Sequence, residues 1–178
     1  MIMFTLVVGG AASGKSEYAE GLVLASPHFP RYYVATMEPF DDEGRARVEK
    51  HRRMRANKRF ETVERYTGLS GVRLPERGTA LLECLGNLAA NELYSPNGAG
   101  NREDALTAVV SGVQALLDQC RDLVVVSTEV FTGGDRYEPG TDDYMRVLAG
   151  ANRALAQRAD RVCEVVCGLP RYYKGAGE

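Results

Sequence analysis

One stretch near the start of the chain has the residue types and the spacing needed to hold phosphate groups. Residues 9–16 fit the pattern Gly-x-x-x-x-Gly-Lys-Ser and stand between a short apolar run and a helix-like segment. Glycines let the backbone curl so that its N–H groups point at phosphates, and the following helix adds its positive end. The alternative is a loop of small residues that only turns a strand into a helix. The residues of the motif are Gly9, Gly10, Ala11, Ala12, Ser13, Gly14, Lys15 and Ser16.

Within this motif, Lys15 is expected to reach the β- and γ-phosphates, and Ser16 offers a hydroxyl to Mg²⁺. Such a loop also needs a carboxylate near the metal, usually at the end of an apolar strand. Glu83, which closes the run 79–83, is the first candidate, and Glu129, after the run 122–128, is the second. Either one could instead be a carboxylate solvated at a strand end. We therefore expect Ser16 and Glu83 as the metal ligands.

Residues 41–55 form a second unusual stretch, a charged helix with an acidic start and a basic end. It could be a solvated helix face with pairs such as Glu43–Arg47. A nucleic-acid surface is weakened by its acidic residues and by the net charge of −2. The third interpretation gives His51 a chemical role, because cationic neighbours disfavour its protonation and a neutral imidazole can attack phosphorus. The residues alone leave these three interpretations open.

Apolar, β-rich runs alternate with helical patterns along the chain, which predicts βαβ crossovers and an α/β fold with a mostly parallel sheet. In such a sheet, ligands bind at the carboxyl ends of the strands, where the candidate residues fall. A helix is expected over 103–120, and another after Thr141 as its N-cap. A glycine-rich loop is expected over 132–140. The expected strands are 3–8, 31–36, 79–84, 122–128 and 161–167, and a further helix covers 17–24.

The composition favours a single cytoplasmic domain spanning residues 1–178. The longest apolar runs fall well short of the ~20 residues that a membrane span needs. The first apolar run leads straight into the phosphate-binding motif, so we interpret it as a strand rather than a signal peptide. The four cysteines fit reduced thiols, and Cys163 and Cys167 are expected to be buried as small hydrophobic residues.

Taken together, these motifs resemble the bifunctional adenosylcobinamide kinase/adenosylcobinamide-phosphate guanylyltransferase family over nearly the whole chain. The specific part is the helix of the form Asp-x-Glu-x-x-x-Arg-Val-x-x-His, followed by an aromatic-x-Thr-Val-Glu segment at 60–64. Other shared segments are the phosphate-binding motif at 9–16, Tyr-Val-Ala-Thr at 33–36, Leu-Leu-Glu-Cys-Leu at 81–85, Asn-Glu-Leu at 91–93, and a Gly-Leu-Pro turn at 168–170 followed by Lys174.

The resemblance implies a RecA-like P-loop fold, a three-layer sandwich, and two reactions. ATP or GTP first phosphorylates a hydroxyl of adenosylcobinamide, and GTP then guanylylates His51, which passes GMP to the new phosphate. Mg²⁺ and a homotrimer are implied as well. His51 and Lys15 become the catalytic residues. The nucleotide contacts implied beyond residues 9–16 are Ala35, Thr36, Met37, Arg52, Arg53, Met54, Arg55, Glu64 and Glu83.

The sequence also departs from the family pattern. Thr128 and Phe131 replace Asn and Gly of a frequent Asn-Glu-Val-Gly segment, the loop 132–140 differs, and Phe60 stands where Trp is frequent. Two alternatives remain beside the bifunctional transferase. One is a simple P-loop kinase of a small molecule, and the other is a nucleotide-binding regulatory protein with little turnover. Neither requires the His51 helix together with Glu64.

Overall fold

The computed structural model describes residues 1–128 and 139–175 of the chain. Strands and helices alternate along it, as the apolar runs predict. The strands are β1 (Met3–Gly9), β2 (Arg31–Ala35), β3 (Glu61–Glu64), β4 (Thr79–Glu83), β5 (Asp122–Thr128), β6 (Arg161–Val166) and β7 (Leu169–Lys174). The helices are α1 (Lys15–Ala25), α2 (Asp42–Arg55), α3 (Leu85–Tyr94), α4 (Arg102–Leu117) and α5 (Pro139–Arg158), with 3₁₀ turns η1 (Ala56–Lys58) and η2 (Leu69–Gly71).

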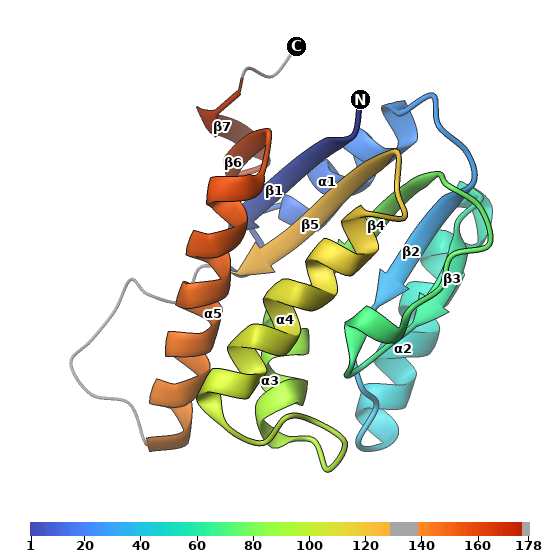
Figure 1. Ribbon diagram of the computed structural model, residues 1–178. Coiled ribbons are helices and arrows are strands. Elements are labelled where there is room, and N and C mark those ends of the chain that lie inside the picture. The colour runs from blue at the N-terminus through green and yellow to red at the C-terminus, as the bar shows by residue number, and fades with distance from the viewer. Residues whose placement is uncertain (129–138, 176–178) are drawn as a thin grey trace.

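The strands of the described chain form one sheet in the order β3-β2-β4-β5-β1-β6-β7 (Figure 1). Every pairing is parallel except that of β6 with β7. The carboxyl ends of β1 to β6 therefore meet at the same edge of the sheet, and the loops that follow them gather there. The expected α/β fold with a mostly parallel sheet is confirmed.

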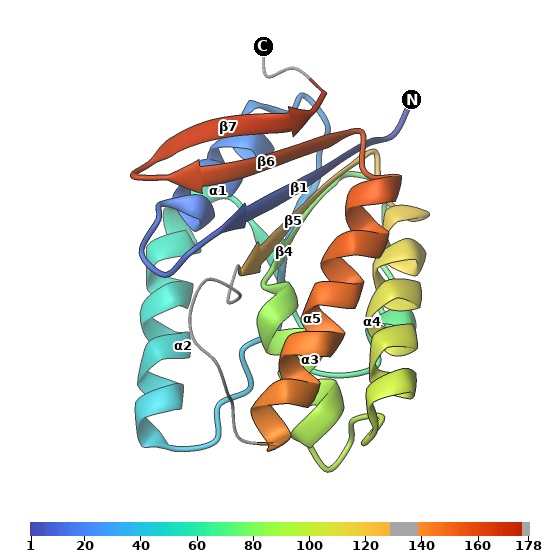
Figure 2. The same cartoon turned by 90° about the vertical axis from the view of Figure 1, so that its left-hand side faces the viewer.

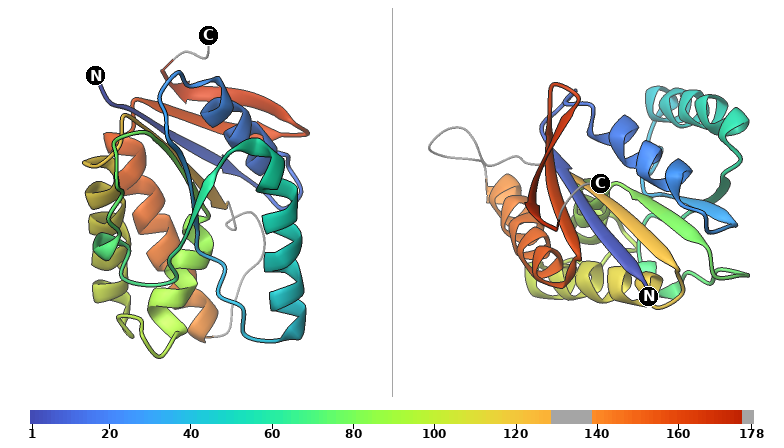
Figure 3. Two further views of the ribbon diagram at one scale, coloured as in Figure 1. Left: turned by 90° about the vertical axis from the view of Figure 1, so that its right-hand side faces the viewer. Right: turned by 90° about the horizontal axis from the view of Figure 1, so that it is seen from above.

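Helices cover both faces of the sheet, which completes a three-layer sandwich. The turned views show α1 and α2 on one side, and α3, α4 and α5 on the other (Figures 2 and 3). The larger core packs α3, α4 and α5 against residues such as Leu6, Leu82 and Val125. The smaller core packs α1 against Val7, Leu81 and neighbours. The central strands are buried on both faces, which explains their continuous apolar runs.

Two edge strands escape the sequence prediction. β3 reads Glu-Thr-Val-Glu, and only Val63 in it is partly buried, so an apolar run is missing. Residues 168–170 were expected to form a Gly-Leu-Pro turn. The turn is instead formed by Cys167 and Gly168, and Leu169 and Pro170 already belong to β7. Edge strands face water on one side and tolerate proline and charge, so their sequences lack the strand signature.

Three local expectations are wrong. Helix α5 begins at Pro139 rather than after Thr141, so Thr141 lies inside the helix; residues 139 and 140 of the expected loop 132–140 belong to the helix, and the rest of that loop lies outside the described residues. Proline suits a first helical position because the missing N–H would have had no partner there. Cys167 is exposed because it lies in the β6–β7 turn with φ 51, while Cys163 is buried as expected. Glu129 and Phe131 lie outside the described residues. Among the described helices, none has the length and apolar character to cross a membrane.

Candidate nucleotide site

The phosphate-binding loop joins the end of β1 to the start of α1, as its pattern predicts. Gly14 caps α1 with φ 87, a left-handed conformation that side chains rarely adopt. A Cβ at Gly9 would lie 2.9 Å from the backbone carbonyl oxygen of Val165 and 2.4 Å from the Ser13 hydroxyl, so this position also requires glycine. At Gly10 a Cβ would meet open space. The loop is thus pinned at both ends and open between them, the shape that a phosphate group requires.

Two contacts fix the conformation of this loop. The backbone N–H of Gly168 donates to the carbonyl of Ser13 at 2.8 Å, which ties the β6–β7 turn to the loop. The ammonium group of Lys15 donates to the carbonyl of Gly10 at 3.0 Å. Lys15 therefore curls over its own loop, with its charge held above the open centre where phosphates would lie.

Ser16 and Glu83 meet at the carboxyl edge of the sheet, although β5 separates β1 from β4. The Ser16 hydroxyl donates to Oε1 of Glu83 at 2.8 Å. The other carboxylate oxygen, Oε2, is buried and has no hydrogen-bond partner among the described residues. Burial raises the pKa of Glu83, and the hydrogen bond from Ser16 opposes that shift. A buried carboxylate oxygen in this state is suited to accept a ligand proton, a metal-bound water or a cation.

Thr36, expected as a nucleotide contact, is buried and contacts the backbone next to Glu83 instead of facing the site. Its side chain is fully buried, and its hydroxyl accepts from the Cys84 N–H at 2.8 Å. The same hydroxyl lies 3.0 Å from the Glu83 carbonyl and 2.8 Å from the Cys84 carbonyl, either of which it can donate to. Thr36 therefore fixes the backbone that carries the Glu83 side chain.

His51 lies on α2 and lines two cavities, both of which also include Glu83. The larger has a volume of about 380 Å³ and opens between α1 and α2, where Ser16 also lines it. The smaller, about 50 Å³, lies toward the ends of β2 and β3. The other residues that line the larger cavity are Ser16, Glu17, Glu20, Tyr33, Met54, Arg55 and Lys58. The other residues that line the smaller cavity are Tyr33, Ala35, Met37, Val48, Arg55, Glu64 and Asn87.

The surroundings of His51 keep its imidazole neutral. His51 is an exposed residue on α2, but partial burial of its ring lowers its pKa, and the charges of Arg55, Lys50 and Arg47 lower this pKa further, while Glu20 opposes them. This agrees with the sequence argument about cationic neighbours, and burial adds to it. A neutral imidazole keeps a lone pair on one nitrogen, so it can act as a nucleophile at neutral pH.

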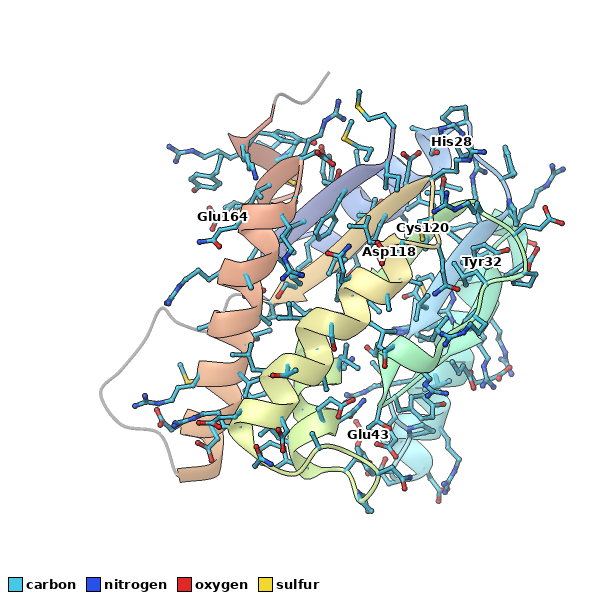
Figure 4. The ribbon with its side chains drawn as sticks, in the orientation of Figure 1. His28, Tyr32, Glu43, Asp118, Cys120 and Glu164 are labelled. Carbon is cyan, nitrogen blue, oxygen red and sulfur yellow. The ribbon has the colours of Figure 1, made fainter. Side chains whose placement is uncertain are left out.

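The chain's other histidine lies at the opposite end of the sheet. His28 follows α1 near the start of β5, with its Nε2 atom 3.9 Å from the Asp122 carboxylate. Figure 4 labels His28 at the end of the molecule opposite to Glu43, which lies in the first turn of α2. Since the sequence contains two histidines, His51 is the one at the nucleotide edge.

The basic end of α2 divides between the site and solvent. Arg55 is buried and lines both cavities. Arg52 is paired with Glu64 through its Nε at 2.8 Å, so these two candidates hold each other at the rim. Arg53 points outward and donates to Glu49 at 3.4 Å. Met54 is exposed and covers one side of the larger cavity.

Several lining residues were missed by the sequence argument. Glu20 on α1 and Lys58 on η1 form an ion pair across the larger cavity, and Tyr33 and Asn87 line the site from β2 and α3. Tyr33 stands inside a segment that was noted for its strand pattern, two residues before the expected contact Ala35. Alternation along a strand places both on the same face, which was the available signal.

A loop that curls around an open centre, a serine bonded to a buried carboxylate, and helices on both faces of a parallel sheet define a P-loop nucleotide-binding protein of the RecA-like type. The fold agrees with the crystal structure of flagellar accessory protein FlaH from Methanocaldococcus jannaschii. The TM-score is 0.54 at 11% identity, over 99% of this chain and 82% of that chain.

Within that class, residues 5–172 match the family model described as cobinamide kinase / cobinamide phosphate guanyltransferase. The chain belongs to this family and is an enzyme of that kind, which confirms the resemblance inferred from its motifs. Its curated relatives include the bifunctional adenosylcobalamin biosynthesis protein CobU of Escherichia coli strain K12, 33% identical over 94% of this chain and 97% of the relative. CobU of Salmonella typhimurium is 30% identical with the same coverage. CobP of Pseudomonas aeruginosa is 29% identical over 97% and 98%.

Proposed function

We propose that the whole chain is one domain that carries out both steps at the site around His51. It phosphorylates the hydroxyl of the aminopropanol arm of adenosylcobinamide with ATP or GTP. It then transfers GMP from GTP to that phosphate through a guanylylated His51, which gives adenosylcobinamide-GDP in cobalamin biosynthesis. The observation that carries this proposal is that His51 and Ser16 of the phosphate-binding loop line the same cavity.

The guanylyl step is a pair of displacements at the α-phosphorus. A nitrogen lone pair of neutral His51 forms the P–N bond, and the bond from the α-phosphorus to the bridging oxygen breaks, so pyrophosphate leaves. An oxygen of the corrinoid phosphate then attacks the same phosphorus, and the P–N bond breaks and returns the imidazole. Positioning and charge stabilisation supply most of the catalysis in such transfers.

Lys15 stabilises the charge that develops on the transferred and departing phosphates. For this, its ammonium exchanges the Gly10 carbonyl for phosphate oxygens, a change that rotation of the flexible side chain allows. The backbone N–H groups of residues 10–16 and the start of α1 hold the β- and γ-phosphates. The nucleotide contacts proposed for Ala35, Met37, Met54, Arg55 and Glu64 are supported by their place in the cavity linings.

The residues near the loop fit a Mg²⁺ ion. The unpartnered oxygen of Glu83 and the hydroxyl of Ser16 are hard oxygen donors side by side, and Mg²⁺ takes one or two such groups with waters and phosphates. Within the described residues, a group of three His, Cys, Asp or Glu able to hold a metal alone is not found. Mg²⁺ bound there would neutralise phosphate charge and help fix the phosphates in line. Glu83 would hold it while Ser16 releases the hydrogen bond between them.

The test is covalent labelling with GTP that carries ³²P at the α-position. The expected product is a protein-bound label that is acid-labile and alkali-stable, as a phosphoramidate is. His51→Ala should remove the label, while the matched control His28→Ala, at the other end of the sheet, should keep it. Transfer of a γ-label to cobinamide with no α-label would favour the simple kinase. Tight nucleotide binding without transfer would favour the regulatory protein.

Two further expectations accompany this proposal. The protein works in the cytoplasm, where GTP and ATP are available, and it assembles as a homotrimer, as the family resemblance implies. Light scattering tests the second, since a monomeric mass at working concentration would overturn it.

A further inference from the structure

Arg55 is a buried cation at the centre of the proposed site. It follows His51 by four residues, one helical turn further along the same face of α2. Its side chain is 6% exposed, and its Nε atom has no hydrogen-bond partner among the described residues. A buried guanidinium with a free donor needs something to hold it in place and something to bind.

An aromatic ring holds this guanidinium. The central carbon of the Arg55 guanidinium lies 3.8 Å from the centroid of the Tyr33 ring, a cation–π contact. Phe60 packs edge-on against Tyr33, with ring centroids 5.7 Å apart and an interplanar angle of 80°. Phe60 therefore helps to hold the ring of Tyr33 in place while that ring supports the cation.

This mode of support differs from an ion pair in its consequence for ligands. A carboxylate partner would occupy guanidinium N–H donors and cancel the charge, as Glu64 does for Arg52. A ring face attracts the cation without accepting its in-plane N–H groups, so those donors stay available for phosphate oxygens. The stack thus keeps Arg55 both fixed and charged.

We propose that Tyr33 is a positioning residue, whose ring holds the Arg55 guanidinium beside His51 so that it binds the α-phosphate of GTP while the imidazole attacks. This inference rests on the proposed function and deepens it, because it identifies the group that neutralises the reacting phosphate. Tyr33, Arg55, His51 and Glu83 line both cavities, so one movement of the guanidinium changes the surroundings of nucleophile and carboxylate together.

A change in the position of Arg55 can be measured through the pKa of His51, because that pKa depends on the charged groups around the imidazole. Arg47, Lys50 and Arg55 on α2 lower the pKa of His51 after burial, and Glu20 on α1 raises it. The same cavities are lined by Lys58 of η1, Glu64 of β3 and Glu83 of β4. Among the charges that lower this pKa, that of Arg55 acts most strongly. If Arg55 leaves its place, the pKa of His51 rises, and the neutral imidazole forms at higher pH.

The experiment compares Tyr33→Leu, Tyr33→Phe and the control Tyr32→Leu. Tyr32, labelled in Figure 4, is also a buried tyrosine on the same strand, but it packs into the larger core on the opposite face of the sheet. We measure the rate of α-³²P labelling at saturating GTP against pH, and the titration of His51 by NMR. With only two histidines in the chain, the assignment needs one variant.

Tyr33→Leu should slow labelling about tenfold, the loss expected for a desolvated cation–π contact, and should move the pH midpoint upward. Tyr33→Phe keeps the ring face under the guanidinium and removes only the hydroxyl's interaction with Arg55, so it should retain clearly more of the labelling rate than Tyr33→Leu. Tyr32→Leu should keep the rate per folded molecule and the pH midpoint. In a double-mutant cycle, Tyr33→Leu should add little to Arg55→Gln, because the cation that the ring holds is already absent.

Three results would overturn the proposal. One is a parental rate and pH midpoint in folded Tyr33→Leu, another is equal damage from Tyr33→Phe, and the third is full additivity of Tyr33→Leu with Arg55→Gln. If Tyr33→Leu does not fold, Phe60→Leu loosens the same ring and should show the same upward shift on a smaller scale. A parent protein that takes no α-label refutes the proposed function instead, and the NMR titration of His51 then still tests whether Tyr33 positions Arg55.

Discussion

Replacing Glu83 with glutamine should make the protein more stable and much less active. Glu83 is a buried carboxylate with one oxygen bonded to Ser16 and the other without a partner among the described residues. The glutamine side chain has nearly the same shape, and its carbonyl oxygen can keep the bond from Ser16. The substitution therefore removes a buried charge with little change in packing, and with it the carboxylate that the proposed metal site needs.

The sign of the stability change follows from the raised pKa of Glu83. In the folded protein this carboxyl holds its proton to higher pH than in the unfolded chain. The favourable contribution of the protonated form is present below the unfolded pKa of about 4.3, and it is lost as pH rises through the folded pKa. At neutral pH the carboxylate is thus destabilising, and the gain from Glu83→Gln is present there and disappears in acid.

The gain is about 1 kcal/mol, because relief of the buried charge is partly offset by an amide N–H₂ group without an acceptor. For a chain of this size it corresponds to a rise in Tm of about 2–4 °C. Activity in both steps should fall about 10–100-fold, as for the loss of a group that holds a metal or its water. Thermal unfolding at pH 7 and pH 4 and labelling by α- and γ-labelled GTP measure the two effects.

The matched control is Glu92→Gln, at a second buried glutamate with the opposite expectation. Both oxygens of Glu92 accept backbone N–H groups, from Gly68 at 2.6 Å and from Ala99 at 3.0 Å. A glutamine there must point its own NH₂ group at one of these N–H donors, so one hydrogen bond is lost, which lowers the free energy of unfolding by about 1–3 kcal/mol. A lower Tm for Glu83→Gln at pH 7, or a gain that persists unchanged at pH 4, would refute the reasoning, and parental activity would exclude Glu83 from the chemistry.

Other variants test the support of the site. Gly14→Ala places a Cβ 3.1 Å from the Gly168 Cα at φ 87, so it should cost about 1–3 kcal/mol and weaken nucleotide binding; calorimetric affinity equal to the parent's would contradict this. Thr36→Val removes the hydroxyl that accepts from the Cys84 N–H and should lower stability by about 1–3 kcal/mol; chemical denaturation would show no change if that bond were dispensable. A thiol reagent should modify exposed Cys167 rapidly, while burial raises the pKa of Cys84 to about 11 and protects its thiol; equal rates for the two would be inconsistent with the fold.

The central strands and the phosphate-binding loop are predictable because their residue types follow from local requirements. A run buried on both faces must be apolar, and the glycines at 9 and 14 meet a close approach and a positive φ. β3 and β7 could not be predicted in the same way, since pairing at a sheet edge depends on a neighbour far away in the chain. The start of α5 was misplaced for another reason: Thr141 was preferred as a cap over the helix-start signal of Pro139.

Whether His51 faces the phosphate-binding loop depends on how α2 is rotated about its own axis. The sequence of the helix partly predicts this rotation. Most of its residues are charged and exposed, but Val48 is an apolar residue that must face protein. His51 and Arg55 follow Val48 by three and seven residues, so they share its face, and the structure places all three in the lining of the smaller cavity. The sequence could therefore have oriented the helix. It could not have supplied the ring of Tyr33, which comes from β2 and reaches Arg55 because β2 and β3, the strands that α2 connects, pair side by side in parallel. The charge of α2 can therefore be predicted from the local sequence, while the position of the Arg55 guanidinium in the site depends on contacts that only the fold creates.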